Sequence, residues 1–259
     1  HYYLNIECEM DNMISFRKNL SFSVHILTAS GVICSYMCIS NIFKKEIELC
    51  FFWLGIALII DVIDGPLARK LDIKNKYPSI NGLMLDTIVD YINWIFLPVL
   101  ILFQFDLVYK NLEFILVPAL LLIPALSYST TITTNSDKSY SGMPAIWNLL
   151  AVFFFLAETN VMFNSLIMII FLILKFLPIN ISHPFRTKKL FYFNSIFAFV
   201  WIATSTILIA EKIFVNSYIS SLVQNLWYLS SSYFVISFIY SFTMTVSKIR
   251  LIDKNEFTI

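Results

Sequence analysis

The chain has 259 residues, of which 58% are hydrophobic and 14% are charged, and its mean hydropathy is +0.76. Soluble domains carry about 25% charged residues, so this composition argues against a soluble domain and against a disordered chain. The formal net charge of +1 at pH 7 leaves no global basic surface, and we therefore expect no nucleic-acid partner.

Apolar runs long enough to cross a bilayer recur along the chain. They predict an all-α polytopic membrane protein with about eight transmembrane helices. Pro118 and Pro124 interrupt the fourth predicted span, and the fifth is short for a span. The eight predicted spans cover residues 20–43, 47–67, 82–103, 112–129, 144–157, 161–177, 190–210 and 219–246.

These runs divide the chain into a transmembrane domain with a segment at each end. Residues 20–246 are predicted to form the transmembrane domain. Residues 1–19 are mixed in character, which is compatible with a helix lying on the membrane surface, and residues 247–259 form a polar tail.

The basic residues are distributed unequally between the two sets of loops. Of the 18 Lys and Arg, thirteen fall in loops and tails on one side and four on the other, with Lys175 near a span end. Cytoplasmic loops carry the excess of Lys and Arg. The thirteen-residue side, which includes both termini, is therefore expected to face the cytoplasm. The four residues on the other side are Lys44, Lys45, Lys110 and Lys212.

The four cysteines suggest no cross-linked framework. Cys34 and Cys38 lie four apart within the first apolar run, and no Cys-x-x-Cys pair or neighbouring His accompanies them. We expect buried free thiols rather than a zinc site or a disulfide.

Four aspartates form two pairs at the ends of adjacent spans. Asp61 and Asp64 are three residues apart near the end of the second span, and Asp86 and Asp90 are four apart near the start of the third. Both spacings place two carboxylates on one helix face. Carboxylates aimed at one point favour protonation unless a cation is present, and hard divalent cations bind carboxylate oxygens. The pairs therefore predict a divalent-metal site on the cytoplasmic side.

An ion or metal transporter would also place carboxylates in the membrane. It would need acidic residues near mid-bilayer or along a path to the far side. All eight Glu lie in tails, in loops or at span edges, and the Asp pairs lie at one face. The pattern favours an interfacial enzyme and leaves the transporter as a remote alternative.

The residues around the pairs form a longer pattern. They read Asp-x-x-Asp-Gly-x-x-Ala-Arg from Asp61 to Arg69, then Gly-x-x-x-Asp-x-x-x-Asp from Gly82 to Asp90. This pattern resembles the signature of the CDP-alcohol phosphotransferase family, and all eight signature positions are filled. The link of residues 70–81 is longer than in most members. Its length resembles one subgroup, the bacterial phosphatidylcholine synthases.

The resemblance implies roles for the signature residues. One or two divalent ions, Mn²⁺ or Mg²⁺, would be held by the four Asp, and Asp90 would also be the catalytic general base. The first span adds His25, which stands where many members have Asn, and Thr28. The CDP-diacylglycerol contacts implied by the resemblance are His25, Thr28, Gly65, Ala68, Arg69 and Gly82.

The subgroup implies choline as the acceptor of the phosphatidyl group, with CMP as the leaving group. Sister enzymes of the family use serine, glycerol phosphate or inositol phosphate, and these acceptors remain the alternative. Aromatic faces attract a quaternary ammonium. The predicted choline contacts are Trp147 first, then Asn148, Tyr91, Trp94, Tyr128 and Tyr140. His183 and Arg186 lie in a further segment that resembles the subgroup and are predicted to contact the lipid phosphate.

The family resemblance also implies the surroundings of the chain. Its partners would be CDP-diacylglycerol, choline and membrane lipid, and the family implies a homodimer, although nothing in this sequence indicates one. The predicted location is the bacterial cytoplasmic (inner) membrane, with a transmembrane catalytic domain whose active site faces the cytoplasm.

Overall fold

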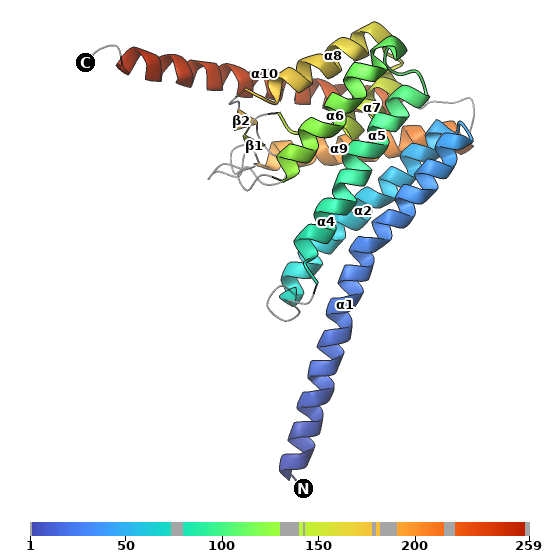
Figure 1. The fold of residues 1–259 in the computed structure, drawn as a ribbon, viewed down its shortest axis with the longest axis vertical. Coiled ribbons are helices and arrows are strands. Elements are labelled where there is room, and N and C mark those ends of the chain that lie inside the picture. Colours follow the sequence, from blue (N-terminus) through green and yellow to red (C-terminus); the bar gives the residue numbers. More distant parts are fainter. Residues whose placement is uncertain are drawn as a thin grey trace. The chain divides into compact units, whose positions relative to one another are not determined.

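The fold is given by a computed structural model (Figure 1). It describes residues 2–73, 80–129, 140–141, 143–177, 180–181, 191–214 and 221–256, without the side chains of residues 2–21, 140–141, 180–181, 246 and 248–256. Contacts within the chain separate two compact units, His1–Asn93 and Trp94–Ile259.

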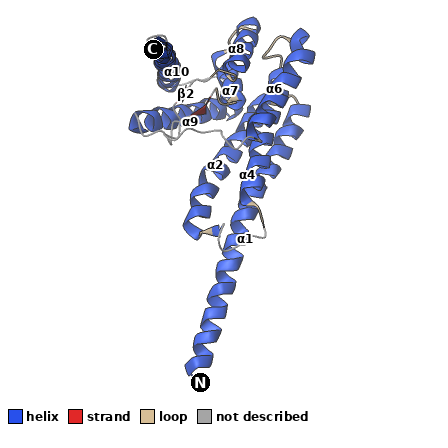
Figure 2. Ribbon diagram, turned by 60° about the vertical axis from the view of Figure 1, so that its left-hand side comes forward, coloured by secondary structure: helices blue, strands red, loops and turns tan. Residues whose placement is uncertain are grey.

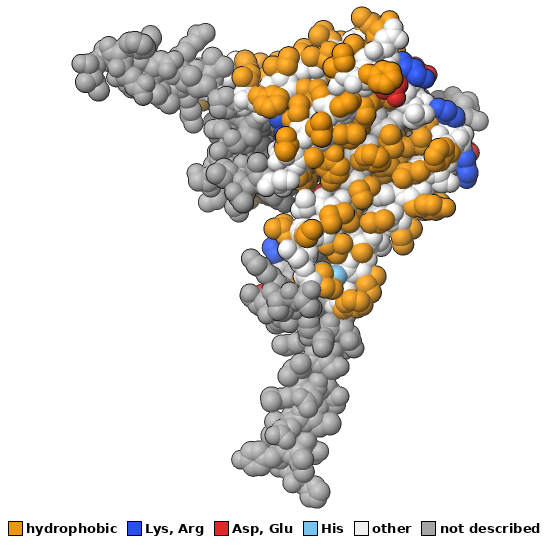
Figure 3. Space-filling model, viewed as in Figure 1, with side chains coloured by type: hydrophobic (Ala, Val, Ile, Leu, Met, Phe, Trp, Pro, Cys, Tyr) orange, Lys and Arg blue, Asp and Glu red, His pale blue; other side chains and the backbone are white. Residues whose placement is uncertain are grey.

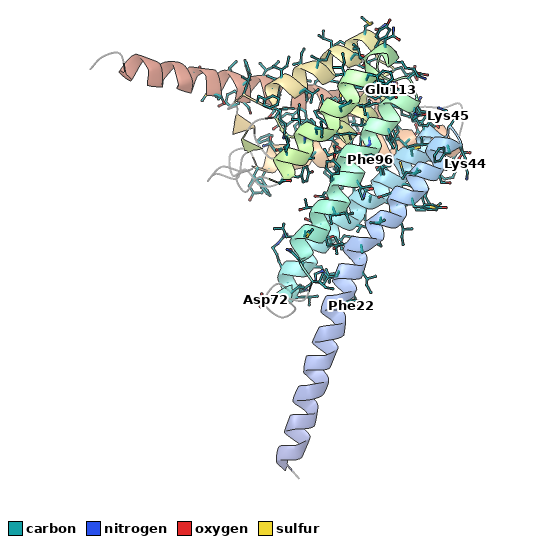
Figure 4. The ribbon with its side chains drawn as sticks, in the orientation of Figure 1. Phe22, Lys44, Lys45, Asp72, Phe96 and Glu113 are labelled. Carbon is teal, nitrogen blue, oxygen red and sulfur yellow. The ribbon has the colours of Figure 1, made fainter. Side chains whose placement is uncertain are left out.

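The first unit begins with a helical hairpin. α1 (Tyr2–Phe43) and α2 (Ile47–Leu71) lie side by side in both ribbon views (Figures 1 and 2). In the tight turn between them, Lys45 takes a left-handed conformation with φ of 61°, and the Glu46 N–H donates to the Asn41 carbonyl at 3.0 Å. Figure 4 shows Lys44 and Lys45 at this turn, and Phe22 and Asp72 at the opposite end of the hairpin.

A third helix completes the first unit. α4 (Gly82–Asp90) begins at Asn81, whose side chain accepts a hydrogen bond from the Met84 N–H at 3.1 Å, the usual role of a helix N-cap. α4 leads directly into a π-helical turn, η1 (Tyr91–Phe96), whose first three residues belong to this unit.

α1 and α4 pack in parallel, and both helices approach closely at small residues. A Cβ atom on Gly82 would lie 3.0 Å from Cε1 of His25, and one on Gly31 would lie 2.6 Å from Cγ1 of Val89. Further along α1, the Ser35 hydroxyl lies 3.0 Å from Oδ1 of Asn93, in the η1 turn that follows α4. The order of these three contacts fixes the register of α4 along α1.

The second unit consists mainly of helices. After the end of η1 come α5 (Leu97–Gln104), a 3₁₀ turn η2 (Lys110–Leu112), α6 (Glu113–Tyr128), α7 (Trp147–Ala157), α8 (Val161–Leu174), α9 (Phe191–Phe214) and α10 (Ser221–Glu256). Two short strands, β1 (Tyr140–Ser141) and β2 (Asn180–Ile181), pair antiparallel, with Tyr140 opposite Ile181. The all-α prediction did not include this strand pair.

Tryptophan–serine hydrogen bonds join α9 to α10. Nε1 of Trp201 donates to Oγ of Ser231 at 3.0 Å, and Nε1 of Trp227 donates to Oγ of Ser205 at 2.9 Å. All four residues are buried. Apolar packing alone gives helices little preference for each other over lipid, so such bonds help specify how two membrane helices pair.

The helices and their surface confirm a polytopic membrane protein. Over the described residues, each of the eight predicted spans overlaps a helix. Among the described residues, four helical stretches are long and apolar enough to cross a membrane: Phe22–Phe43, Gly82–Gln104, Lys110–Tyr128 and Phe191–Phe214. The predicted fifth and sixth spans correspond to the shorter apolar helices α7 and α8.

Large apolar side chains cover much of the described surface in Figure 3, and Phe114 is 93% exposed. In a bilayer these side chains would contact lipid tails. Residues 2–43 form one continuous helix, so no break separates the described part of the predicted surface segment 1–19 from the first span. Its location on the membrane surface, like the domain limits, stays a prediction. Cys34, Cys38 and Cys50 are buried and free, as predicted.

Candidate active site

Three of the four predicted aspartates converge in the first unit. Asp61 comes from α2, and Asp86 and Asp90 come from successive turns of α4. One carboxylate oxygen from each lies within 4.8 Å of the others, and all three residues are half-buried. Three hard oxygen donors from two helices fit a Mg²⁺- or Mn²⁺-type ion, which prefers carboxylate ligands. We refer to Asp61, Asp86 and Asp90 as the carboxylate cluster.

Asp64 lies one turn beyond Asp61 on α2 and is buried, with 4% of its surface exposed. It is not part of the group of oxygens within 4.8 Å. Its spacing still places it on the same side of α2 as Asp61. A ligand role for Asp64 therefore stays a prediction.

His25 and Gly82 form a small cradle between α1 and α4. His25 is 8% exposed, and its Nε2 atom has no hydrogen-bond partner among the described residues. Leaving a buried polar atom unpaired costs about 1–3 kcal/mol. The ring approaches Gly82 so closely that a Cβ there would lie 3.0 Å from Cε1. Because Nε2 is buried without a partner and the ring lies against a residue that has no side chain, His25 is a candidate contact for a polar ligand group.

The other predicted nucleotide contacts lie on the same helices. Thr28 is buried one turn after His25, and its hydroxyl donates to the Val24 carbonyl at 3.2 Å, which leaves the oxygen able to accept. On α2, the Arg69 guanidinium bends back over Gly65, where a Cβ would lie 3.4 Å from Nη1. Ala68 is half-buried on the same helix. An exposed guanidinium beside a bare backbone suits an oxyanion.

The predicted choline contacts are divided between the two units. Tyr91 follows Asp90 in the first unit and is half-buried, whereas Trp94, Tyr128, Trp147 and Asn148 belong to the second. The structure describes only the backbone of Tyr140, in β1, and His183 and Arg186 lie outside the described residues. The choline and lipid-phosphate contacts stay predictions.

Trp147, the first of these candidates, has a clear role in the fold. The residue is completely buried, and its indole Nε1 donates to the Leu120 carbonyl at 3.0 Å. Leu120 lies four residues before Pro124, which has no N–H to offer that carbonyl. Trp147 therefore supplies the hydrogen bond that Pro124 removes from α6.

Two features, one in each unit, were not anticipated from the sequence. Asn93 is almost completely buried three residues after Asp90 and bonds to α1. In the second unit, Nζ of Lys175 donates to the Met143 carbonyl at 3.2 Å, and the Met143 N–H donates to the Leu174 carbonyl at 3.4 Å. These bonds attach the chain just before α7 to the end of α8.

Comparison with known proteins identifies several relatives that share one name. The chain is 28% identical to a phosphatidylcholine synthase of Pseudomonas aeruginosa over 86% of this chain and 92% of that protein. It is 34% identical to a phosphatidylcholine synthase of Rhizobium meliloti (73% and 78%) and 35% identical to one of Borreliella burgdorferi (66% and 73%). The family model for CDP-alcohol phosphatidyltransferases matches residues 24–177, which include every signature residue. The chain belongs to the CDP-alcohol phosphatidyltransferase family.

Proposed function

We propose that this chain is a phosphatidylcholine synthase. It would transfer the phosphatidyl group of CDP-diacylglycerol to the hydroxyl of choline and release CMP. The observation that carries the proposal is the convergence of Asp61, Asp86 and Asp90 from two separate helices within 4.8 Å. The similarity to phosphatidylcholine synthases over most of both chains supports choline as the acceptor.

The carboxylate cluster would hold a divalent ion, Mn²⁺ or Mg²⁺, with Asp64 as a further ligand if a second ion binds. When bound, such an ion neutralises charge on a pyrophosphate and stabilises in-line displacement at phosphorus. The donor set supports this role because carboxylate oxygens are the ligands that these ions prefer.

The remaining signature residues would bind the cytidine diphosphate group. Nε2 of His25 and Oγ1 of Thr28 offer polar contacts at the cradle beside Gly82. Arg69 would contact a phosphate oxygen across Gly65, and Ala68 leaves room on the same helix. The His183–Arg186 segment would contact the phosphate on the lipid side.

Asp90 would act as the general base. It accepts the proton of the choline hydroxyl, and the choline oxygen attacks the phosphorus that carries diacylglycerol. The bond from that phosphorus to the oxygen of the CMP phosphate then breaks, and CMP leaves with the bonding electrons. A positioned general base contributes about 10²- to 10⁴-fold to such a reaction.

Tyr91 is the choline candidate that we would test first. It directly follows Asp90 and is half-buried, whereas the indole N–H of Trp147 is committed to the Leu120 carbonyl. Trp147, Asn148, Trp94, Tyr128 and Tyr140 remain further candidates for the acceptor site.

The proposed location is the bacterial inner membrane, with the carboxylate cluster on the cytoplasmic side. The excess of Lys and Arg in the loops on the side of Arg69 supports this orientation. A homodimer stays an expectation from the family resemblance.

The acceptor can be tested directly. Purified protein with CDP-diacylglycerol and Mn²⁺ is offered choline, serine, glycerol phosphate and inositol phosphate separately, and lipid products are identified by mass spectrometry. We expect phosphatidylcholine and an equal amount of CMP with choline. A faster reaction with serine, glycerol phosphate or inositol phosphate would indicate instead a sister enzyme of the family that uses that acceptor. Metal binding without CMP release from any acceptor would favour a transporter.

A further inference from the structure

The helix that carries Asp86 and Asp90 changes its geometry directly after Asp90. α4 ends there, and residues Tyr91–Phe96 form a π-helical turn. A π turn accommodates one extra residue. Because each residue turns an α-helix by about 100°, the side chains before and after the turn lie on faces that are offset by about that angle. Such turns are rare and frequently lie at functional sites. The direction in which Asp86 and Asp90 point therefore depends on how this turn is held.

Asn93 holds the turn against α1. It is 1% exposed, and its Oδ1 atom lies 3.0 Å from the Ser35 hydroxyl. Its Nδ2 donates to the Gly31 carbonyl at 3.4 Å, and the same Ser35 hydroxyl also lies 3.0 Å from that carbonyl. Ser35 is itself buried. Three polar groups thus form a closed network between α1 and the π turn.

Gly31 brings the two helices close enough for this network. A Cβ at position 31 would lie 2.6 Å from Cγ1 of Val89, which is shorter than any ordinary contact. Val89 immediately precedes Asp90, and Asn93 lies one turn beyond Val89. The contact therefore fixes the part of α4 that presents Asp90.

α1 is the common support for both halves of the carboxylate cluster. α2, which carries Asp61, packs along α1, and α4, which carries Asp86 and Asp90, packs along the same helix. The position of Asp86 and Asp90 relative to Asp61 consequently depends on how each helix is attached to α1. On the α4 side, the network of Asn93, Ser35 and Gly31 is a buried polar attachment to α1.

We propose that Asn93 is a positioning residue for the carboxylate cluster. By hydrogen bonding to Ser35 and Gly31, it fixes the π turn and the rotation of α4 at which Asp86 and Asp90 face Asp61. It contacts neither substrate nor metal and acts through α4. The inference rests on the proposed metal-dependent function, because its consequence is the affinity of the cluster for a divalent ion.

The test measures Mn²⁺ binding directly, without turnover. Purified full-length protein is titrated with Mn²⁺, and the free ion is measured by electron paramagnetic resonance. Asn93→Leu replaces the amide with an apolar side chain of similar size, and Ser35→Ala removes a single partner. Asn164→Leu is the matched control, since Asn164 is also completely buried and its Nδ2 donates to the Leu107 carbonyl at 2.8 Å in the second unit.

We expect Asn93→Leu to weaken Mn²⁺ binding about tenfold, the lower end of the effect of removing groups that orient metal ligands. Ser35→Ala should weaken binding less, and adding it to Asn93→Leu should have little further effect because both act in one network. Asn164→Leu should lower the melting temperature without changing the Mn²⁺ dissociation constant. In turnover, Asn93→Leu should lower kcat and leave the KM for choline unchanged.

A wild-type dissociation constant in Asn93→Leu, accompanied by the same loss of melting temperature as in Asn164→Leu, would overturn the positioning role. If Asn93→Leu does not fold, Ser35→Ala decides, and unchanged Mn²⁺ binding in it overturns the role. Mn²⁺ binding by an Asp86→Asn variant distinguishes failure of the positioning role from failure of the proposed metal site. Binding lost in Asp86→Asn but retained in Asn93→Leu refutes the positioning role alone, whereas binding unaffected by Asp86→Asn refutes the proposed site and this inference with it.

Discussion

Replacing Trp147 with Phe tests whether the indole of Trp147 supplies the hydrogen bond that Pro124 removes from α6. The indole N–H of Trp147 donates to the Leu120 carbonyl at 3.0 Å, and Pro124 lacks the N–H that this carbonyl would otherwise accept. Phe keeps an aromatic ring and removes the donor. The Leu120 carbonyl then has no donor from either residue.

The expected cost follows from the burial of the bond. An unsatisfied buried polar group costs about 1–3 kcal/mol, whereas hydrogen bonds within membrane proteins average about 0.6 and reach about 1.7 kcal/mol. Trp147 is completely buried, so we expect a loss near the top of the membrane range, about 1.5 kcal/mol. In a protein of this size this lowers the melting temperature by about 3–6 °C.

Trp147→Phe also removes ring volume, and a second substitution separates the two effects. Pro124→Ala restores an N–H that can reach the Leu120 carbonyl within α6. The double variant Pro124→Ala/Trp147→Phe should therefore be more stable than the sum of the single effects by about 1 kcal/mol. The assay is thermal unfolding of the four purified proteins in one detergent. Additive effects of the two substitutions would refute the reasoning.

Three further predictions concern the candidate site. Asp61→Asn should abolish most CMP release because it removes one ligand of the cluster, and excess Mn²⁺ should restore part of it; wild-type activity in the presence of chelator would contradict this. Gly82→Ala should raise the KM for CDP-diacylglycerol, because the added Cβ would lie 3.0 Å from Cε1 of His25 and displace the ring; an unchanged KM would remove the cradle from the nucleotide site. Tyr91→Leu should raise the KM for choline about 2- to 30-fold, the range of one cation–π contact, and an unchanged choline KM would eliminate Tyr91 as a choline contact.

The sequence predicted the helices and named all three residues of the carboxylate cluster because both predictions depend on local spacing. Each predicted apolar run lies on a helix, and the four-residue interval between Asp86 and Asp90 places both on one face of α4. Asp64 shows the limit of this argument. It shares a face of α2 with Asp61, but the direction of that face depends on how α2 packs, which residue spacing does not encode. The oxygens of Asp64 lie outside the group within 4.8 Å.

The features that the sequence did not predict join residues far apart in the chain. Asn93 bonds to Gly31, 62 positions away, and the π turn that allows this has no distinguishing residue pattern. The sequence showed Pro124 interrupting the fourth predicted span, but only the structure identifies Trp147 as the donor to the Leu120 carbonyl. The pairing of β1 with β2 was missed because each strand has two residues, too few for any alternation of apolar and polar positions.

The rate of CMP release by Asp90→Asn protein tests the central claim most directly. Wild-type and variant protein are supplied with the same CDP-diacylglycerol, choline and Mn²⁺, and binding of CDP-diacylglycerol is measured in parallel. We expect the variant to bind the nucleotide lipid and to release CMP at least about 100-fold more slowly, because the choline hydroxyl loses its base. CMP release by Asp90→Asn at the wild-type rate would contradict the assignment of the carboxylate cluster as the catalytic centre.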